Sequence, residues 1–123
     1  MNLVDSSGWL EYFAGGANAD FFEEAILNTS ELLVSTINIY EVYKKILTEN
    51  NETSAMEAVS YMNQGNIINV DLSISLQAAE LSSRLKLPMA DSLIYITAVL
   101  NEATIFTQDA DMKDLSGVKY IKK

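Results

Sequence analysis

The residues of this sequence that could do chemistry are its carboxylates. Asp5 ends the apolar segment "NLVD", and Asp109 ends "TIFTQD". Asp91 lies near the start of "MADSLIYITAVL", in which almost every later residue is apolar or small. Each has an ordinary structural alternative, because aspartate also caps helices and forms turns. If the apolar segments are parallel strands and the third is a helix, all three acids lie at the sheet edge where such folds bind ligands.

A fourth carboxylate, Glu41, lies in "INIYEVYKKILTE", a segment with helical periodicity. Ile37, Tyr40 and Leu47 predict an apolar stripe along this helix, and Glu41 borders it. A charge beside apolar surface is costly unless it is paired or bound to a cation. The structural alternative is a half-exposed side chain. Including Glu41, four acids from four separate segments are expected to converge.

The chain contains no histidine and no cysteine. Catalysis by a Ser-His-Asp triad or a Cys-His pair is therefore excluded, as is a zinc site built on imidazole or thiolate. Converging acids without basic neighbours are either partly protonated or neutralised by a cation. Oxygen ligands select hard cations such as Mg²⁺ or Mn²⁺. Cations held in this way can activate water and bind the oxygens of a phosphodiester.

Length and charge limit the remaining possibilities. The chain has 123 residues with 17 acids and 8 bases, a net charge of −9. This length predicts a single domain over residues 1–123. No apolar run approaches the roughly 20 residues of a membrane span, and the first residues lack a signal-peptide pattern, so a cytoplasmic protein is expected. The negative charge repels nucleic acid at long range and favours a basic partner.

Short apolar runs alternate with amphipathic segments along the chain, which predicts an α/β fold with a mainly parallel sheet covered on both faces. The expected strands are residues 2–5, 32–36, 67–71, 104–109 and 119–121. The expected helices are residues 6–15, 19–27, 37–49, 52–64, 73–87 and 90–101.

Four segments of the sequence resemble, in order and spacing, the acidic motifs of PIN-domain ribonucleases. They are "LVDSSGWLEYF", "INIYEVY", "ADSLIYITA" and "TIFTQDADM". The resemblance is greatest to the toxins of VapBC-type toxin–antitoxin pairs, and it covers nearly the whole chain. It implies a PIN-like three-layer α/β/α sandwich with a five-stranded, mainly parallel sheet. It also implies an endoribonuclease that hydrolyses RNA phosphodiester bonds with Mg²⁺ or Mn²⁺.

The resemblance also assigns roles to individual residues. The catalytic and metal-binding acids it implies are Asp5, Glu41, Asp91 and Asp109. It assigns supporting roles to three further residues: Ser6, Thr107 and Asp111. The hydroxyls of Ser6 and Thr107 are expected to donate hydrogen bonds to a carboxylate or to metal-bound water. The chain departs from the family pattern at Asn38, where relatives often carry threonine, and this change is expected to affect how the nearby acid is oriented.

The partners that the resemblance implies are an RNA substrate, a small antitoxin with a basic segment, and a second copy of the chain in a homodimer. Two other classes of function stay open. An acidic receiver module that accepts a phosphoryl group would use a third-strand aspartate, for which Asp71 is the candidate, although Asp71 also fits a helix cap. The second is a catalytically silent PIN-like binding protein. A haloacid-dehalogenase phosphatase fits poorly, because the pair Asp109 and Asp111 follows the wrong strand.

Overall fold

The computed structural model describes residues 1–123 and contains every strand and helix expected from the sequence, with ends that differ by at most three residues. The strands are β1 (Asn2–Val4), β2 (Leu32–Ser35), β3 (Asn66–Ile68), β4 (Thr104–Thr107) and β5 (Val118–Tyr120). The helices are α1 (Ser6–Ala14), α2 (Ala19–Leu27), α3 (Thr36–Glu49), α4 (Glu52–Met62), α5 (Leu72–Leu85) and α6 (Met89–Leu100). Short 3-10 helices at Thr29–Glu31 and Ala110–Met112 were not expected.

The five strands form one sheet in the order β3-β2-β1-β4-β5, and all neighbouring strands are parallel. From β1 the chain builds outward to β2 and β3, and it then returns to add β4 on the opposite side of β1. The strand order therefore reverses between β1 and β4. In open parallel sheets, ligands bind beyond the carboxyl ends of the strands at such a reversal. This places the residues that follow β1 and β4 at the expected functional edge.

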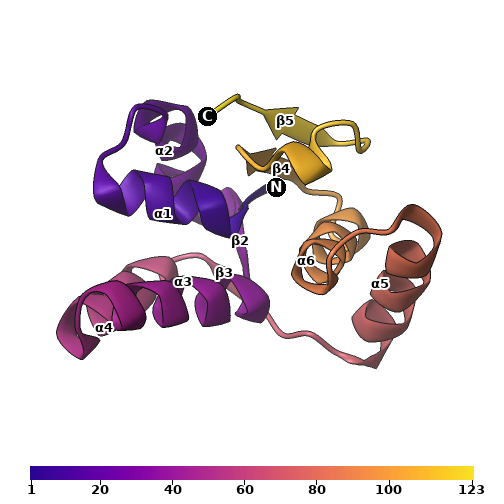
Figure 1. Cartoon of the computed structure of the whole chain (residues 1–123), viewed down its shortest axis with the longest axis horizontal. Coiled ribbons are helices and arrows are strands. Elements are labelled where there is room, and N and C mark those ends of the chain that lie inside the picture. The colour runs from indigo at the N-terminus through magenta and orange to yellow at the C-terminus, as the bar shows by residue number, and fades with distance from the viewer.

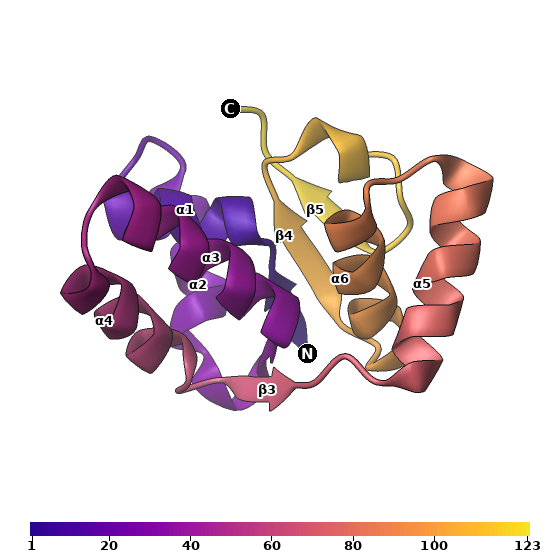
Figure 2. The ribbon, with the colours of Figure 1, turned by 60° about the horizontal axis from the view of Figure 1, so that its bottom comes forward.

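Helices cover both faces of the sheet, as the alternating pattern predicts (Figure 1). Val4 and Val34 face a core formed with α1, α2, α3 and α4. Leu3 and Leu33 face the opposite core, which α6 covers through Ile94. This alternation follows from the two-residue period of a strand. Figure 2 shows α5 and α6 together on one side of the molecule and α1 to α4 on the other. The three-layer α/β/α architecture is thus confirmed.

Local sequence explains several element boundaries. Gly15 ends α1 with a φ of 64°, a left-handed conformation that glycine adopts without strain. Asp71 caps α5, where its side chain accepts a hydrogen bond from the backbone N–H of Ile74 at 2.9 Å. The role of Asp71 is therefore the cap. Strand β4 ends at Thr107, so the expectation that Asp109 is the last strand residue is wrong by two positions.

Each helix is too short, or carries too little apolar sequence, to cross a lipid bilayer.

Candidate metal centre

Asp5 immediately follows β1 and is only 3% exposed. Its Oδ2 atom accepts hydrogen bonds from the hydroxyls of Ser7 and Thr107, each at 2.9 Å. Burial raises the pKa of Asp5, while the hydrogen bonds from Ser7 and Thr107 partly oppose that effect and the nearby charge of Asp109 adds to it. The Asp5 carboxylate is therefore fixed in place between β1 and β4.

Glu41 approaches Asp5 from α3, and the place where these acids meet is the acidic pocket. Its Oε1 atom accepts a hydrogen bond from the hydroxyl of Ser6 at 2.7 Å. Burial raises the pKa of Glu41; the bond from Ser6 lowers it, and the charges of Asp5 and Asp109 raise it further. Residues 5 and 41, far apart in sequence, are thus close enough in space to repel each other.

The prediction of an apolar stripe along α3 is wrong. Tyr40 is 61% exposed and Leu47 is 42% exposed, whereas the fully buried residues of this helix are Asn38 and Val42. The buried face therefore includes a polar residue, which a count of apolar positions passes over. Glu41 borders this face one turn after Asn38, which is why it is half-buried and directed toward the sheet edge.

Asp91 lies in the first turn of α6, but it does not cap that helix, since the N-terminal cap position is Pro88 and makes no side-chain bond. Neither Asp91 oxygen accepts a hydrogen bond from another residue. Burial, the charges of Asp109, Asp5 and Glu41, and a smaller effect of Asp111 raise the pKa of Asp91 to about 7. The side chain is thus a half-buried carboxyl group surrounded by other acids.

Asp109 and Asp111 complete the acidic cluster. The backbone N–H of Asp111 donates to Asp109 Oδ1 at 2.9 Å, so Asp109 does form the turn considered as its structural alternative. The backbone N–H of Asp109 donates to the Thr107 hydroxyl at 2.9 Å. One carboxylate oxygen from each of Asp91, Asp109 and Asp111 lies within 4.8 Å of the others. That spacing is close to the about 4–5 Å between two oxygens on opposite sides of one hard cation.

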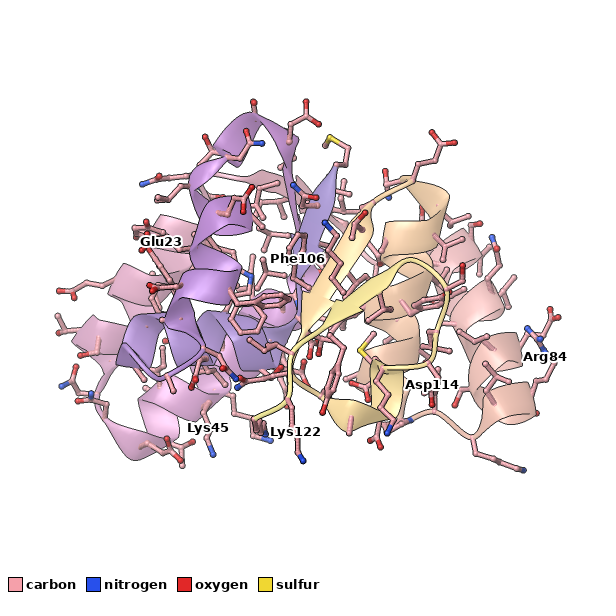
Figure 3. All side chains as sticks on the ribbon, turned by 90° about the horizontal axis from the view of Figure 1, so that it is seen from above. Glu23, Lys45, Arg84, Phe106, Asp114 and Lys122 are labelled. Atoms are coloured by element: carbon pink, nitrogen blue, oxygen red, sulfur yellow. The ribbon has the colours of Figure 1, made fainter.

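No basic side chain neutralises these acids. The two salt bridges of the molecule join the N-terminal amine of Met1 to Glu31 and Lys45 to Glu49, both at exposed positions. Figure 3 shows Lys45, Arg84 and Lys122 projecting from separate parts of the surface. The pocket offers only oxygen ligands and carries uncompensated negative charge. This donor set fits Mg²⁺ or Mn²⁺, and it does not fit zinc.

The seven residues selected from the sequence all lie in or against this pocket, and the structure adds two more. Ser7 donates to Asp5, and Asn38 donates through Nδ2 to the Ser6 hydroxyl at 3.0 Å. In the sequence, the two consecutive serines that follow Asp5 were the available signal for Ser7. The signal for Asn38 was its departure from the family pattern, from which an effect on the orientation of the nearby acid was expected.

The strand order also decides against the receiver module. Receiver domains of the CheY type have the order 2-1-3-4-5, in which the third strand lies beside the first. Here β2 and β4 flank β1, and β3 is an edge strand. Together with the capping role of Asp71, this topology removes the receiver alternative.

Comparison with solved structures gives three informative neighbours. A toxin–antitoxin complex from Klebsiella pneumoniae contains a chain that is 26% identical, with a TM-score of 0.80 over 97% of this chain and 96% of that one. VapC20 of Mycobacterium tuberculosis, described as a toxin that cleaves the sarcin–ricin loop, is 15% identical with a TM-score of 0.80 over 96% and 97% of the two chains. VapBC-1 of nontypeable Haemophilus influenzae is 14% identical with a TM-score of 0.75 over 98% and 96%.

A search of curated proteins finds no match. The sequence pattern of the PIN domain family matches residues 3–118, which include β4, all but the first residue of β1 and every acid of the pocket. The match spans nearly the full chain, and it agrees with the four acidic motifs of the sequence and with the parallel five-stranded sheet. The chain belongs to the PIN domain family.

Proposed function

We propose that this protein is a divalent-metal-dependent endoribonuclease that hydrolyses RNA phosphodiester bonds, and that it is the toxin of a toxin–antitoxin pair. The observation that carries the proposal is the pocket of acids at the β1/β4 reversal, which has no basic partner in the protein. Membership of the PIN domain family supports the same function. The sarcin–ricin loop named for the Mycobacterium tuberculosis neighbour supports RNA as the substrate class.

In this proposal the acids bind the metal and the hydroxyls orient the acids. Asp91, Asp109 and Asp111 are the three acids whose oxygens lie close enough together for one cation. Asp5 and Glu41, whose charges act on Asp91, complete the proposed set of ligands. Bound Mg²⁺ or Mn²⁺ supplies an activated water and stabilises negative charge on the phosphate oxygens. Thr107 and Ser6 each donate to one of the acids, which limits the directions in which Asp5 and Glu41 can turn. The retained acids and their hydroxyl partners argue against a catalytically silent binding protein.

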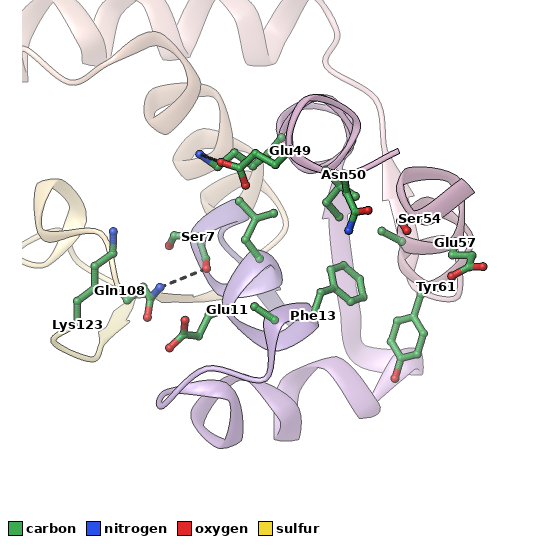
Figure 4. Close-up of a pocket in the computed structure, with 15 residues that line it drawn as sticks. Ser7, Glu11, Phe13, Glu49, Asn50, Ser54, Glu57, Tyr61, Gln108 and Lys123 are labelled. Atoms are coloured by element: carbon green, nitrogen blue, oxygen red, sulfur yellow. Dashed lines mark hydrogen bonds and ion pairs between the residues drawn. The ribbon is translucent and has the colours of Figure 1, made fainter. Parts of the chain in front are cut away.

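A groove beside the pocket supports a protein partner. It has a volume of about 970 Å³ and lies between α1, α3, α4 and the C-terminal segment (Figure 4). Ser7, which bonds to Asp5, and Gln108, which follows β4 and donates to the Ser7 carbonyl at 3.4 Å, both line it. A segment bound in this groove therefore ends next to the acids.

The lining of the groove suits an apolar and basic segment. Leu10, Phe13 and Ile46 provide apolar surface. The charged residues of the lining are three glutamates and two lysines: Glu11, Glu49, Glu57, Lys45 and Lys123. We infer that an antitoxin occupies the groove and places a basic side chain among the pocket acids, where it replaces the metal. The Klebsiella pneumoniae neighbour, described as a toxin–antitoxin complex, supports this kind of partner.

The remaining parts of the proposal concern the whole chain. Residues 1–123 act as one PIN domain in the cytoplasm, where RNA and an antitoxin are both available. Homodimerisation stays a prediction, for which Leu72, Leu76 and Met89 provide exposed apolar surface.

The test is cleavage of a defined RNA by the purified protein in Mn²⁺ or Mg²⁺, followed on a denaturing gel. The wild-type protein is expected to cut with either metal and to be inactive in EDTA. Asp5→Ala is expected to lose the activity while its circular dichroism stays unchanged, because the buried carboxylate is a ligand and not a fold determinant. Asp114→Ala, at an exposed acid three residues after Asp111, is the matched control and keeps full activity. Wild-type activity of Asp5→Ala, or undiminished cleavage in EDTA, contradicts the proposal.

A further inference from the structure

A buried polar side chain, Asn38, connects the end of β2 to the acidic pocket. Its side chain is completely inaccessible to solvent. The Oδ1 atom accepts a hydrogen bond from the backbone N–H of Ser35 at 3.0 Å. A backbone N–H can only donate, so this contact fixes which end of the amide is oxygen. The Nδ2 end therefore faces the Ser6 hydroxyl, to which it donates at 3.0 Å.

The Ser6 hydroxyl has a single proton, and the bond from Asn38 determines where that proton goes. Ser6 Oγ accepts from Asn38, whose Nδ2 can only donate, and it donates to Glu41 Oε1 at 2.7 Å, since a carboxylate oxygen can only accept. Three hydrogen bonds thus run in one direction from the backbone of Ser35 to the carboxylate of Glu41. Glu41 is in this way tied to the sheet as well as to its own helix.

Thr107 provides a comparison within the same pocket. Its hydroxyl accepts from the backbone N–H of Asp109 and donates to Asp5 Oδ2, both at 2.9 Å. The Ser6 and Thr107 hydroxyls therefore each receive one N–H and donate to one acid. For Thr107 the N–H belongs to the backbone. For Ser6 it belongs to a side chain, so the orientation of Glu41 depends on the residue type at position 38.

We propose that Asn38 is a positioning residue for cation binding, which acts by orienting the Ser6 hydroxyl toward Glu41. The inference rests on the proposed function, because it requires that Glu41 binds a cation. Without a directed donor, the long and half-buried Glu41 side chain is free to turn toward solvent. Residues that orient metal ligands in this way typically change metal affinity by about 10–100-fold when removed.

The experiment is a double-mutant cycle on Mn²⁺ affinity, measured by electron paramagnetic resonance of the unbound ion. It compares the wild-type protein, Asn38→Ala, Ser6→Ala and the double variant. Each single substitution is expected to weaken Mn²⁺ binding about tenfold. The double variant is expected to bind no more weakly than Ser6→Ala, because Asn38 acts through Ser6. If the losses of Mn²⁺ affinity in the two single variants multiply in the double variant, the inference is wrong. It is also wrong if Asn38→Ala binds Mn²⁺ with wild-type affinity.

Ser35→Ala separates positioning from loss of the helix cap. The Ser35 hydroxyl accepts the backbone N–H of Ile37 at 3.1 Å, so its removal weakens the start of α3. The backbone N–H that Ser35 donates to Asn38 remains in this variant. Ser35→Ala is therefore expected to have a lower melting temperature in EDTA and unchanged Mn²⁺ affinity. If Ser35→Ala weakens Mn²⁺ binding as much as Asn38→Ala, stability of α3 explains both results and the inference is wrong.

Three further outcomes have a defined meaning. If circular dichroism shows that Asn38→Ala is unfolded, Asn38→Ser replaces it, since a serine hydroxyl is too short to bridge Ser35 and Ser6, and the same affinity criteria apply. If the wild-type protein binds no Mn²⁺, the proposed function fails and this inference fails with it. If the wild type binds Mn²⁺ and the position-38 variants bind it equally well, only the inference fails.

Discussion

At the scale of single residues, Asp91 has the environment that departs most from that of an ordinary aspartate near a helix start. It makes no capping bond, and it is half-buried beside other carboxylates that it repels. In an apo protein these repulsions have no compensating contact. They are tolerable if binding of a cation turns the same negative charges into ligands.

Asp91→Asn is expected to stabilise the metal-free protein and to remove most of its stabilisation by Mn²⁺. At a pH above the raised pKa of about 7, where Asp91 is ionised, loss of its charge relieves repulsion with Asp109, Asp5 and Glu41. An increase of about 1 kcal/mol is expected, the size of one charge–charge interaction at about 4 Å in water. Mn²⁺ stabilises the wild-type protein by an amount that grows with the logarithm of its binding affinity, and the variant loses that affinity. The measurement is urea unfolding in EDTA and in Mn²⁺.

Asp114→Asn makes the same chemical change at an exposed acid and serves as the control. It is expected to leave both the stability in EDTA and the gain with Mn²⁺ unchanged. A destabilised Asp91→Asn in EDTA means that Asp91 has a structural role and that repulsion is not its main interaction.

The acids of the pocket were predictable because their positions follow from simple rules. Asp5 ends an apolar run and Asp91 starts an apolar helix, and in a parallel sheet these places share one edge. The face of α3 was not predictable in the same way. Its buried positions combine Asn38 with Val42, and only the tertiary contacts of Asn38 with Ser35 and Ser6 explain why a polar residue is buried there.

At the scale of elements, the contact between α1 and α4 depends on a pair of tyrosines. The hydroxyls of Tyr12 and Tyr61 are hydrogen-bonded at 3.0 Å, and Phe13 packs edge-on against the Tyr61 ring. The hydrogen bond to Tyr61, together with burial and smaller charge effects, raises the pKa of Tyr12 to about 12. The hydrogen bond between the hydroxyls of Tyr12 and Tyr61 therefore contributes to the packing of α1 against α4.

Stability is expected to fall with increasing pH between the usual tyrosine pKa of about 10 and the raised value of about 12. In that window the unfolded chain loses the Tyr12 proton while the folded protein keeps it, so deprotonation favours unfolding. The contribution is complete below pH of about 10 and is lost above the folded-state pKa. The measurements are the ultraviolet titration of tyrosinate and urea unfolding across this range.

Tyr61→Phe tests the cause, since it removes the hydroxyl and keeps the ring. The pKa of Tyr12 is then expected to return toward its usual value, whereas Tyr40→Phe, at an exposed position of α3, leaves it unchanged. If the pKa of Tyr12 in the wild-type protein has its usual value, the role assigned to the hydrogen bond is wrong.

The order and type of the elements were predictable from alternating hydrophobic patterns, while their ends and spatial order were less so. Strand β4 stops at Thr107 because Asp109 turns the chain with its own side chain. The short helices at 29–31 and 110–112 have no periodic pattern long enough to detect. The position of β4 beside β1 depends on contacts between distant segments, which local sequence does not encode.

At the scale of the whole molecule, a net charge of −9 and the cluster of unpaired acids favour a basic partner over an unaided approach of RNA. We expect a labelled synthetic peptide of alternating arginine and leucine to bind, with affinity that decreases as salt increases and as Mn²⁺ is added. Salt screens the attraction, and Mn²⁺ competes for the same acids. Fluorescence anisotropy is the measurement.

Two glutamate variants distinguish groove binding from general attraction to an acidic surface. Glu57 lines the groove on α4, whereas Glu80 is an exposed residue of α5 outside it. Glu57→Gln is expected to weaken peptide binding several-fold, and Glu80→Gln to leave it nearly unchanged. Equal effects of the two variants show that the peptide does not select the groove.

The bond between Thr107 and Asp5 joins residues that are 102 positions apart. During synthesis on the ribosome, Asp5 emerges early but meets its partner only after almost the entire polypeptide has been made. No N-terminal fragment that stops before β4 can assemble the pocket. The nascent chain therefore lacks the arrangement of acids on which the proposed activity depends until its synthesis is nearly complete.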